Sequence, residues 1–334
     1  MKLRFLIRLG ARIGIALGFL AAVIWLAFIP SPKEPPYTFV GAWGGKGHAP
    51  GQFDDPTGIA VAGEEVFVAD SRNDRIQVFD LQGRFKRQFG SAGAAPGQLG
   101  RPMNLAVRDG RLYVAEYVND RIQVFGLDGT PRAIIGGPGS GPGQFNAPGG
   151  VALAANGDLI VADFYNQRVQ QLKADGSFVR QWGRTGVIGI GAGQFNYPTD
   201  VAVGTDGTVF VADGYNDRIQ AFAADGAFSH KWGGPLAMNV FGPFPGWFAT
   251  VTSLAVDGRG QLFAADFYNH RVQKFSADGT FLTQFGSRGE GRGRFEYVIA
   301  VAVAADESVF AVDFGNQRVT RWRPQADSVR DPRP

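Results

Sequence analysis

The sequence predicts an all-β protein: a six-bladed β-propeller of four-stranded antiparallel blades, preceded by one N-terminal transmembrane helix. One segment recurs six times, with an acidic residue, an asparagine three positions later and an arginine five positions later, at intervals of 46 to 53 residues. A repeat of that length is typical of propellers and solenoids. The 48 glycines among 334 residues favour many short strands joined by tight turns. The acid–arginine pairs are Asp70 and Arg75, Glu116 and Arg121, Asp163 and Arg168, Asp213 and Arg218, Asp266 and Arg271, and Asp313 and Arg318.

The third copy shows the strands of one unit. Four short segments, separated by turn signals, predict one antiparallel blade with strands at 150–153, 159–162, 169–172 and 178–182. The unit opens with Gly143-Gln144-Phe145, continues through Asp163 to Arg168 and ends in an Asp175-Gly176 hairpin. In these motifs residues 37–323 resemble the NHL-repeat family. The resemblance implies a propeller, a fold that hosts both binding and catalysis.

The ends of the repeat array predict how the ring closes. The last copy stops after its third strand, whereas residues 37–44 look like an outer strand without a blade. We therefore expect residues 37–44 to complete the sixth blade. Such closure removes the exposed strand edges that otherwise invite aggregation.

The N-terminal segment predicts a membrane anchor. Residues 13–29 form an uncharged apolar run, and Lys2, Arg4, Arg8 and Arg12 precede it without any acid. This charge bias predicts a cytoplasmic N-terminus and a periplasmic or extracellular propeller. The alternatives are a cleaved secretory signal, although no small-residue cleavage site stands out, and a buried helix. The predicted organisation is a cytoplasmic basic segment (1–12), a transmembrane anchor (13–29), a Pro-rich linker (30–36), the propeller (37–323) and a disordered tail (324–334).

Charge and cysteine content restrict the function. Without the four N-terminal basic residues, 29 of the 33 lysines and arginines remain against 30 acids, so the propeller is near neutral and nucleic acid is not an expected partner. The absence of cysteine excludes disulfides and thiolate metal sites. Oligomeric state cannot be predicted from these features.

The recurring acid and arginine predict a structural role. The acid ends the second strand and the arginine begins the third, so the two side chains should meet across the hairpin in a charge-assisted hydrogen bond. Six ligand sites are the less favoured alternative, since a ligand-specific residue is not needed in every blade.

Aromatic residues on one face predict a ligand-binding surface. The loop between second and third strands and the loop between blades share that face, and two adjacent blade-to-blade loops are longer than the rest. Packing between neighbouring blades is the alternative for the aromatic residues, and a loop dipping into the bilayer is the alternative for the long loops. The candidates are Tyr117, Phe164, Tyr165, Tyr215, Phe267 and Tyr268 on the former loops, and Phe241, Phe244 and Trp247 on a long one.

A metal site is not expected. Gluconolactonase-type propellers, which are similar in blade number, hold a divalent cation near the start of the first strands. Here only Asn104 and Asp200 offer suitable side chains there, which is too few for an oxygen cage, and the three histidines occupy unmatched positions. We therefore predict a membrane-tethered binding or scaffold propeller, without a cofactor, that engages a protein, peptide or envelope glycan. The alternative is a metal-dependent lyase or lactonase-like hydrolase at the channel mouth.

Overall fold

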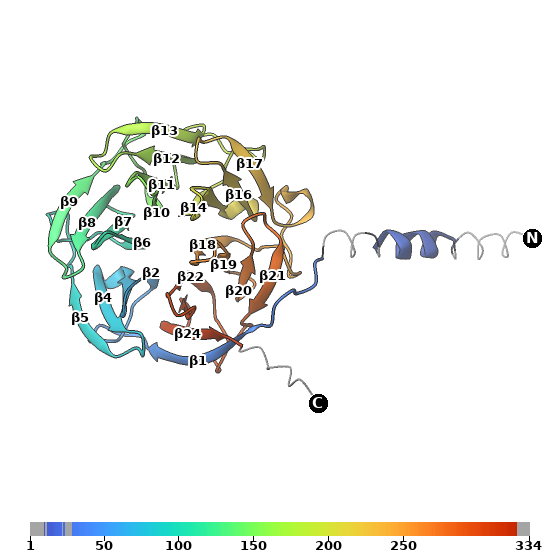
Figure 1. Cartoon of the computed structure of the whole chain (residues 1–334), viewed down its shortest axis with the longest axis horizontal. Coiled ribbons are helices and arrows are strands. Elements are labelled where there is room, and N and C mark those ends of the chain that lie inside the picture. Colours follow the sequence, from blue (N-terminus) through green and yellow to red (C-terminus); the bar gives the residue numbers. More distant parts are fainter. Residues whose placement is uncertain (1–9, 11, 22, 24–28, 326–334) are drawn as a thin grey trace, which may run out of the picture.

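Six four-stranded antiparallel sheets surround a central channel in the computed structural model, which describes residues 10, 12–21, 23 and 29–325 (Figure 1). Each sheet is one blade, and its strands follow one another outward from the channel. The prediction of a six-bladed all-β propeller is confirmed.

The blades are built from consecutive strands. Blade 1 contains β2 (Pro56–Ala62), β3 (Glu65–Asp70), β4 (Arg75–Asp80) and β5 (Phe85–Phe89). Blade 2 contains β6 (Pro102–Arg108), β7 (Arg111–Glu116), β8 (Arg121–Gly126) and β9 (Pro131–Ile135). Blade 3 contains β10 (Pro148–Leu153), β11 (Leu159–Asp163), β12 (Arg168–Leu172) and β13 (Phe178–Gly183).

The second half of the ring repeats the arrangement. Blade 4 contains β14 (Pro198–Val203), β15 (Val209–Asp213), β16 (Arg218–Phe222) and β17 (Phe228–Trp232). Blade 5 contains β18 (Val251–Val256), β19 (Leu262–Asp266), β20 (Arg271–Phe275) and β21 (Phe281–Phe285). Blade 6 contains β22 (Val298–Val303), β23 (Val309–Asp313), β24 (Arg318–Pro324) and β1 (Tyr37–Gly44).

The N-terminal strand closes the ring. β1 pairs antiparallel with β24, from Tyr37 opposite Pro324 to Gly44 opposite Arg318. This confirms that residues 37–44 complete the last blade, so each sheet has its four strands. β24 extends to Pro324, one residue beyond the predicted end of the propeller.

Apolar side chains between adjacent blades hold the ring together. The G-x-F phenylalanines Phe53, Phe145, Phe195, Phe248 and Phe295 are all fully buried. Gly136 shows how closely such a ring packs: it has φ +78°, and a Cβ there would lie 2.3 Å from the ring of Phe145. A buried phenylalanine contributes about 1.5–3 kcal/mol through the hydrophobic effect, so these residues stabilise the blade interfaces.

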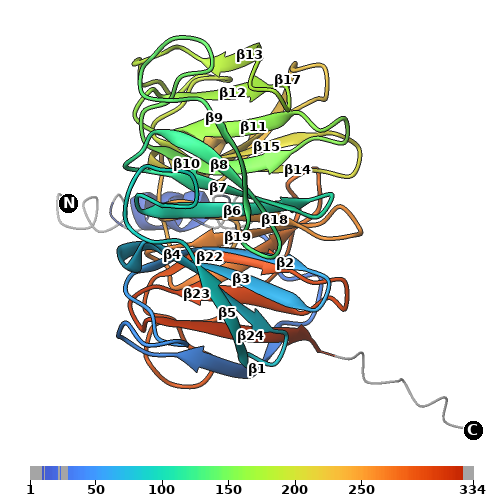
Figure 2. The ribbon, with the colours of Figure 1, turned by 90° about the vertical axis from the view of Figure 1, so that its left-hand side faces the viewer.

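The strands run between two distinct faces of the ring (Figure 2). One face carries the loops from second to third strands and the loops between blades, and we call it the loop face. The other carries the hairpins from first to second and from third to fourth strands, as predicted from an up-and-down blade.

The residues before the propeller reach its rim. Residues 12–21 are helical, and among the described residues no helix is both long and apolar enough to cross a membrane. Residues 22 and 24–28 of the predicted anchor, most of the basic segment and 326–334 of the predicted tail lie outside the described residues. The linker, predicted as a spacer, lies against blade 5: the N–H groups of Lys33 and Glu34 donate to the Leu282 carbonyl at 2.7 and 3.0 Å.

Candidate functional site: the loop face and the channel mouth

The acid–arginine pair of blade 3 is the centre of a buried hydrogen-bond network. Arg168 Nε donates to Asp163 Oδ2 at 2.8 Å, and Asn166 and Gln170 donate to the same oxygen at 2.9 and 3.2 Å. The N–H of Asn146 donates to Asp163 Oδ1. Burial raises the pKa of Asp163, against these hydrogen bonds and the arginine charge, which lower it.

The arginine also holds the loop that leads into its own blade. Arg168 donates to the carbonyls of Ser140, Gly141 and Gln144 at 2.8 to 2.9 Å. We call this arrangement of acid, arginine and loop carbonyls the clamp. It occurs in all six blades, with Nε-to-carboxylate distances of 2.7 Å for Arg75–Asp70, Arg121–Glu116 and Arg218–Asp213, and of 2.8 Å for Arg168–Asp163, Arg271–Asp266 and Arg318–Asp313.

A β-bulge at the start of each first strand shapes the channel mouth. In β10 the pairing with β11 shifts between Pro148 and Gly150, so Gly149 has no partner residue. Four of the other first strands shift at the same place, and in β6 the shift spans Pro102 to Leu105. A bulge re-aims side chains at that point. The second residue of each blade's first strand lines a cavity of about 270 Å³ at the mouth. These residues are Thr57, Met103, Gly149, Thr199, Thr252 and Ile299.

These bulged residues were missed by the sequence analysis, which considered the next position along each strand. In a regular strand every second side chain faces the channel. The extra residue of a bulge shifts this alternation by one position, so a different residue faces the channel there. Of the two residues considered there, Asn104 does line the mouth cavity and Asp200 does not; Ser253 also lines it. The repeated proline before the bulge is the signal that could have revealed it, since proline is confined to strand ends and bulges.

Four of the predicted aromatic residues line the same cavity: Tyr117, Phe164, Tyr165 and Tyr215. Tyr117 and Tyr165 share a 2.7 Å hydrogen bond between hydroxyls, and burial together with this bond raises the pKa of Tyr117 to about 12. Tyr165 is 45% exposed and Tyr215 51% exposed. Phe164 instead packs edge-on to Tyr165 at 5.1 Å and against Tyr197 at 4.9 Å, so it joins neighbouring blades.

A second aromatic cluster lies between blades 5 and 6. Phe267 stacks on Tyr297 at 5.0 Å, and Tyr268 meets the same ring edge-on at 5.9 Å. Tyr268 also lines a separate hollow with Phe241. Tyr197 and Tyr297, which the sequence analysis did not select, therefore occupy equivalent positions as supports for the loop aromatics.

The long loop that follows β17 places its aromatic residues in different environments. The other long loop is 183–193. Phe241 is 72% exposed, whereas Trp247 is only 9% exposed and meets Phe244 edge-on at 5.0 Å. Trp247 replaces the polar residue of the G-x-F motif and lies at the rim rather than at the mouth, because that motif position packs under the loop. The structure thus does not bring Phe244 or Trp247 to the mouth cavity.

Asp200 lies buried beneath the mouth. Its Oδ1 accepts the Val201 N–H and its Oδ2 the Leu254 N–H, both at 2.8 Å. Burial raises the pKa of Asp200 to about 7, while hydrogen bonds from the backbone and from Asn104 and Ser253 lower it. The neighbouring Gly150 leaves room for this carboxylate, since a Cβ there would lie 2.1 Å from Oδ1.

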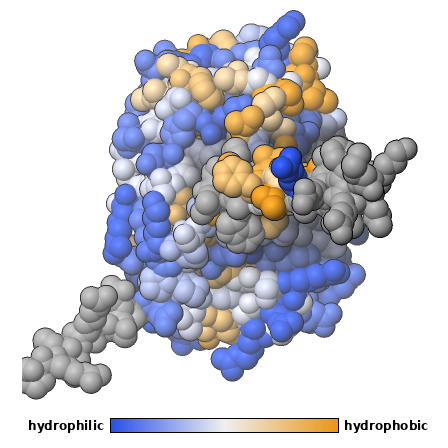
Figure 3. Space-filling view, turned by 90° about the vertical axis from the view of Figure 1, so that its right-hand side faces the viewer, coloured by the Kyte–Doolittle hydropathy of each residue, from blue (hydrophilic) through white to orange (hydrophobic). Residues whose placement is uncertain are grey.

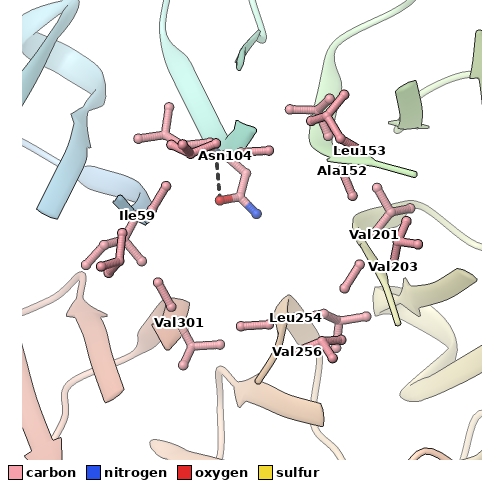
Figure 4. A pocket seen from close by; sticks show the side chains of 18 of the residues that line it. Ile59, Asn104, Ala152, Leu153, Val201, Val203, Leu254, Val256 and Val301 are labelled. Carbon is pink, nitrogen blue, oxygen red and sulfur yellow. Dashed lines mark hydrogen bonds between the residues drawn. The ribbon is translucent and has the colours of Figure 1, made fainter. Parts of the chain in front are cut away.

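Asn104 is a polar side chain that faces the channel, and Arg108 also lines it. Its Oδ1 accepts the Leu105 N–H, and its amide nitrogen points toward the axis (Figure 4). The channel below, about 240 Å³, is lined almost throughout by aliphatic residues of the first strands. The structure brings Asn104 and Asp200 together, but the carboxylate oxygens are turned toward backbone N–H groups.

The described residues contain no group of three histidine or acidic side chains placed to hold a metal ion. The histidines are separate: His270 Nδ1 accepts the Tyr297 N–H, His48 contacts Asn73, and His230 stacks on Trp232. The oxygen cage that Ca²⁺ prefers requires six to eight ligands, and this mouth does not supply them from carboxylates.

Comparison with known proteins identifies the repeat. The NHL repeat family matches residues 53–79, 145–172, 195–222 and 248–275. Each of these segments runs from a G-x-F phenylalanine to the third strand of its blade. Four of the six blades of this β-propeller therefore contain NHL repeats.

Two curated proteins share a short stretch of sequence with this chain. Protein brain tumor of Drosophila melanogaster is 58% identical over 40 residues, which cover 12% of this chain and 4% of that protein. B-box type zinc finger protein ncl-1 of Caenorhabditis elegans is 59% identical over 39 residues, 11% of this chain and 5% of that protein. The likeness is thus confined to about one repeat of much longer proteins.

Solved structures share the fold over most of the chain. A structural-genomics protein of unknown function from Bacteroides thetaiotaomicron has a TM-score of 0.63 and 16% identity, covering 85% of this chain and 76% of that one. Virginiamycin B lyase from Staphylococcus aureus has a TM-score of 0.53 and 16% identity, with 80% of each chain covered. At such identities the similarity concerns the fold alone.

Proposed function

We propose that the protein is a membrane-tethered, extracytoplasmic propeller that binds a protein, peptide or envelope glycan at the mouth of its channel. The observation that carries this proposal is the mouth cavity itself. Tyr117, Tyr165 and Tyr215 gather there above a ring of bulged residues, although only some of the aromatic rings are needed for packing. Exposed, preorganised tyrosines supply apolar contact and a hydrogen-bonding group at low entropic cost.

The floor of the cavity suits a ligand with polar groups. Thr252 Oγ1 is buried at the mouth and has no hydrogen-bond partner among the described residues. An unpaired hydroxyl of this kind costs about 1–3 kcal/mol, which a ligand group could recover. Asn104 adds an amide at the channel side.

The cavity continues toward blade 1. A second hollow of about 300 Å³ shares Thr57, Met103, Tyr117 and Ile299 with the mouth cavity and adds Arg72 and Arg101. Its polar rim differs from the aromatic side contributed by blades 2 to 4. Asp55 also lines this hollow and pairs with Arg72, so an elongated ligand with an apolar or sugar ring at one end and a polar group at the other would fit both hollows.

The tether is supported by the helical residues before the propeller. Ile13, Ile15, Leu17, Phe19 and Leu20 are between 52% and 73% exposed, so this apolar helix does not pack on the propeller. Such a helix needs an apolar environment, and the basic residues before it favour a cytoplasmic N-terminus. The propeller would then lie on the opposite side of the membrane.

The test is a binding screen of the full-length protein in detergent micelles against a glycan array and a peptide array. Tyr165→Ala and Tyr215→Ala should each weaken a selected interaction by tenfold or more, about 1.4 kcal/mol. Phe178→Ala is the matched control, because Phe178 is 40% exposed but lies on the outer strand of the same blade. Equal affinity of the tyrosine variants and the control would contradict the assignment of the mouth.

The alternative of a metal-dependent lyase or hydrolase receives less support from the geometry. It would use Asp200 and Asn104, but both Asp200 oxygens are already engaged by backbone N–H groups. A stoichiometric divalent cation in the purified protein that is lost in Asp200→Ala would favour this alternative.

A further inference from the structure

Two lengthened loops form an apolar surface on the rim of the loop face, which we call the rim patch. The loops are 183–193 and 233–246, and the second contains no charged residue. Seven of their side chains are between 39% and 72% exposed: Val187, Ile188, Ile190, Leu236, Met238, Val240 and Phe241. Exposed apolar residues gathered in this way mark a surface that contacts something other than water.

The two loops form one continuous surface. The Arg218 guanidinium donates to the Ile190 carbonyl of the first loop and, at 3.0 Å, to the Ala237 carbonyl of the second. Arg218 is fully buried, so this connection is fixed within the blade. The shared donor thereby holds the backbones of the two loops close together.

The backbone of the second loop is strained. Leu236, Ala237 and Asn239 have φ values of 57°, 48° and 58°, in the left-handed region that non-glycine residues avoid. For Leu236 and Ala237 this costs of the order of 1–2 kcal/mol each, whereas asparagine adopts the region more readily. Leu236 is 71% exposed, although its side chain is apolar.

The rim patch lies where the chain leads away to the N-terminal helix. Pro30 approaches Gly246, with its Cγ 3.2 Å from where a Cβ would be, and it lines one hollow together with Leu236 and Trp247. Figure 3 looks at this side of the molecule and shows apolar surface on the propeller, above the place where the helix projects toward the viewer. Pro30 comes seven positions after residue 23, a reach of at most about 25 Å.

We infer that the rim patch rests on the lipid bilayer, so that the propeller sits on the membrane by its blade 4 and 5 loops. This rests on the proposed tether: a helix embedded before Pro30 brings the bilayer surface within reach of Leu236 and Phe241. Apolar side chains at such a surface enter roughly 5–10 Å into the headgroup and acyl boundary. Lys33 and Arg184, both exposed, flank the patch and suit anionic headgroups.

The bilayer is favoured over a protein partner because of position. A patch that binds a protein could lie at any position around the ring. The exposed apolar residues of the rim patch instead occur only in the two lengthened loops, and the second of these loops borders the tether. The four short loops contain no comparable apolar run. The mouth remains open beside the patch, so the two surfaces can be occupied together.

The absence of cysteine allows a direct test with the full-length protein. Phe241→Cys and Ile188→Cys are each labelled with an environment-sensitive fluorophore, and the protein is reconstituted in phosphatidylcholine–phosphatidylglycerol vesicles. Ala94→Cys is the matched control: Ala94 is exposed on the short loop between blades 1 and 2, across the ring from the loop between blades 4 and 5 (Figure 1). Equal melting temperatures of the labelled variants establish that each is folded.

The proposal predicts a blue shift and several-fold stronger quenching by spin-labelled lipids at positions 241 and 188 than at position 94. Quenching at 241 and 188 no stronger than at 94, in protein that floats with the vesicles, would overturn the docking while leaving the tether intact. A blue shift without lipid quenching would show that protein covers the patch and would also overturn it. Failure to float would overturn the tether, whereas ligand binding at the mouth is measured separately in detergent.

Discussion

The loop face has two sectors built on one scaffold. The loops that lead into blades 4 and 5 are lengthened and apolar, whereas the four others keep the same short spacing. The short loops leading into blades 1 and 6 carry charges, among them Lys46, Arg288, Glu290 and Arg292. Both sectors nevertheless have the same clamp beneath them, with the same distances between acid and arginine.

The clamp explains how the sectors can differ. Its arginine donates to backbone carbonyls of the loop, such as Ser140 and Gly141 under a short loop and Ile190 and Gly191 under a long one. A backbone acceptor is present whatever the side chain, so the loop sequence is free to change while its attachment stays fixed. Function can thus vary in the loops without loss of the fold.

The largest expected effect is loss of the clamp beneath the apolar sector. Arg218→Ala removes a fully buried guanidinium and leaves the Asp213 carboxylate without its charge partner. We expect the free energy of unfolding to fall by about 3–5 kcal/mol. Urea denaturation followed by tryptophan fluorescence measures it.

Arg318→Ala is the matched control for that variant. The Arg318 side chain is 20% exposed and its loop is short, so water can replace part of its contacts. We expect a loss of roughly 1.5–3 kcal/mol, the range for hydrogen bonds to charged groups. Equal losses in the two variants would show that the apolar sector does not depend specially on its clamp.

A second prediction concerns pH and sharpens the comparison inside the channel. At the position of Asp200 the opposite blade has glycine, Gly58. Because the folded pKa of Asp200 is raised to about 7, the folded state keeps a proton that the unfolded state releases near pH 4. The contribution of Asp200 therefore makes the free energy of unfolding fall as pH rises from about 4 to 7, by up to about 4 kcal/mol.

Asp200→Asn isolates this contribution. The variant cannot titrate at this position, so we expect a flatter dependence of stability on pH. Its amide NH₂ cannot accept the N–H that one carboxylate oxygen accepted, so we also expect lower stability at pH 5. Melting temperatures at pH 5 and pH 7.5 measure the difference. Parallel profiles for the variant and the wild type would contradict the raised pKa.

A smaller effect is expected at the mouth. Tyr165→Phe removes the hydroxyl that hydrogen-bonds Tyr117, whose pKa is raised to about 12 partly through this bond. We expect the Tyr117 pKa to move toward its ordinary value, with a stability loss of no more than about 1.5 kcal/mol. Ultraviolet titration of the phenols measures it, and an unchanged Tyr117 pKa in the variant would show that the hydroxyl pair does not form in solution.

The smallest effect is expected at the linker. Glu34→Gln removes the 2.6 Å ion pair with Lys274 at the rim of blade 5, where Glu34 is 32% exposed. Partly exposed pairs contribute about 0.2–1 kcal/mol, so ring closure by β1 should persist. A loss above that range in thermal unfolding would show that the linker is part of the closure.

Much of the scaffold could be predicted because its sequence motif is repeated six times. Asp163 and Arg168, read with their five counterparts, fixed the period, and residues 37–44 supplied the missing strand. The pairing of β1 with β24 confirms that inference. Repetition lets each copy check the others, and propellers close by a limited number of arrangements.

The site was less predictable because it departs from the repeat. Thr252 and Met103 reach the mouth because each lies in a bulge. A bulge turns one side chain of the strand to the other side and leaves only a weak signal in the sequence. Trp247 is aromatic and lies on a long loop, yet it is buried, because the backbone of that loop turns it inward. Which aromatic residues pack and which stay exposed depends on neighbours such as Tyr197 and Tyr297, which come from other blades.

Hydrogen–deuterium exchange of the full-length protein in lipid vesicles and in detergent micelles tests the central claim most directly, namely that a uniform clamp carries two different sectors. We predict slow exchange in all six clamp hairpins that is the same in vesicles and in micelles, and slower exchange in vesicles only in segments 183–193 and 233–246. Equal protection of the short loops 90–97 and 286–293 in vesicles, or no change in the two long loops, would contradict it.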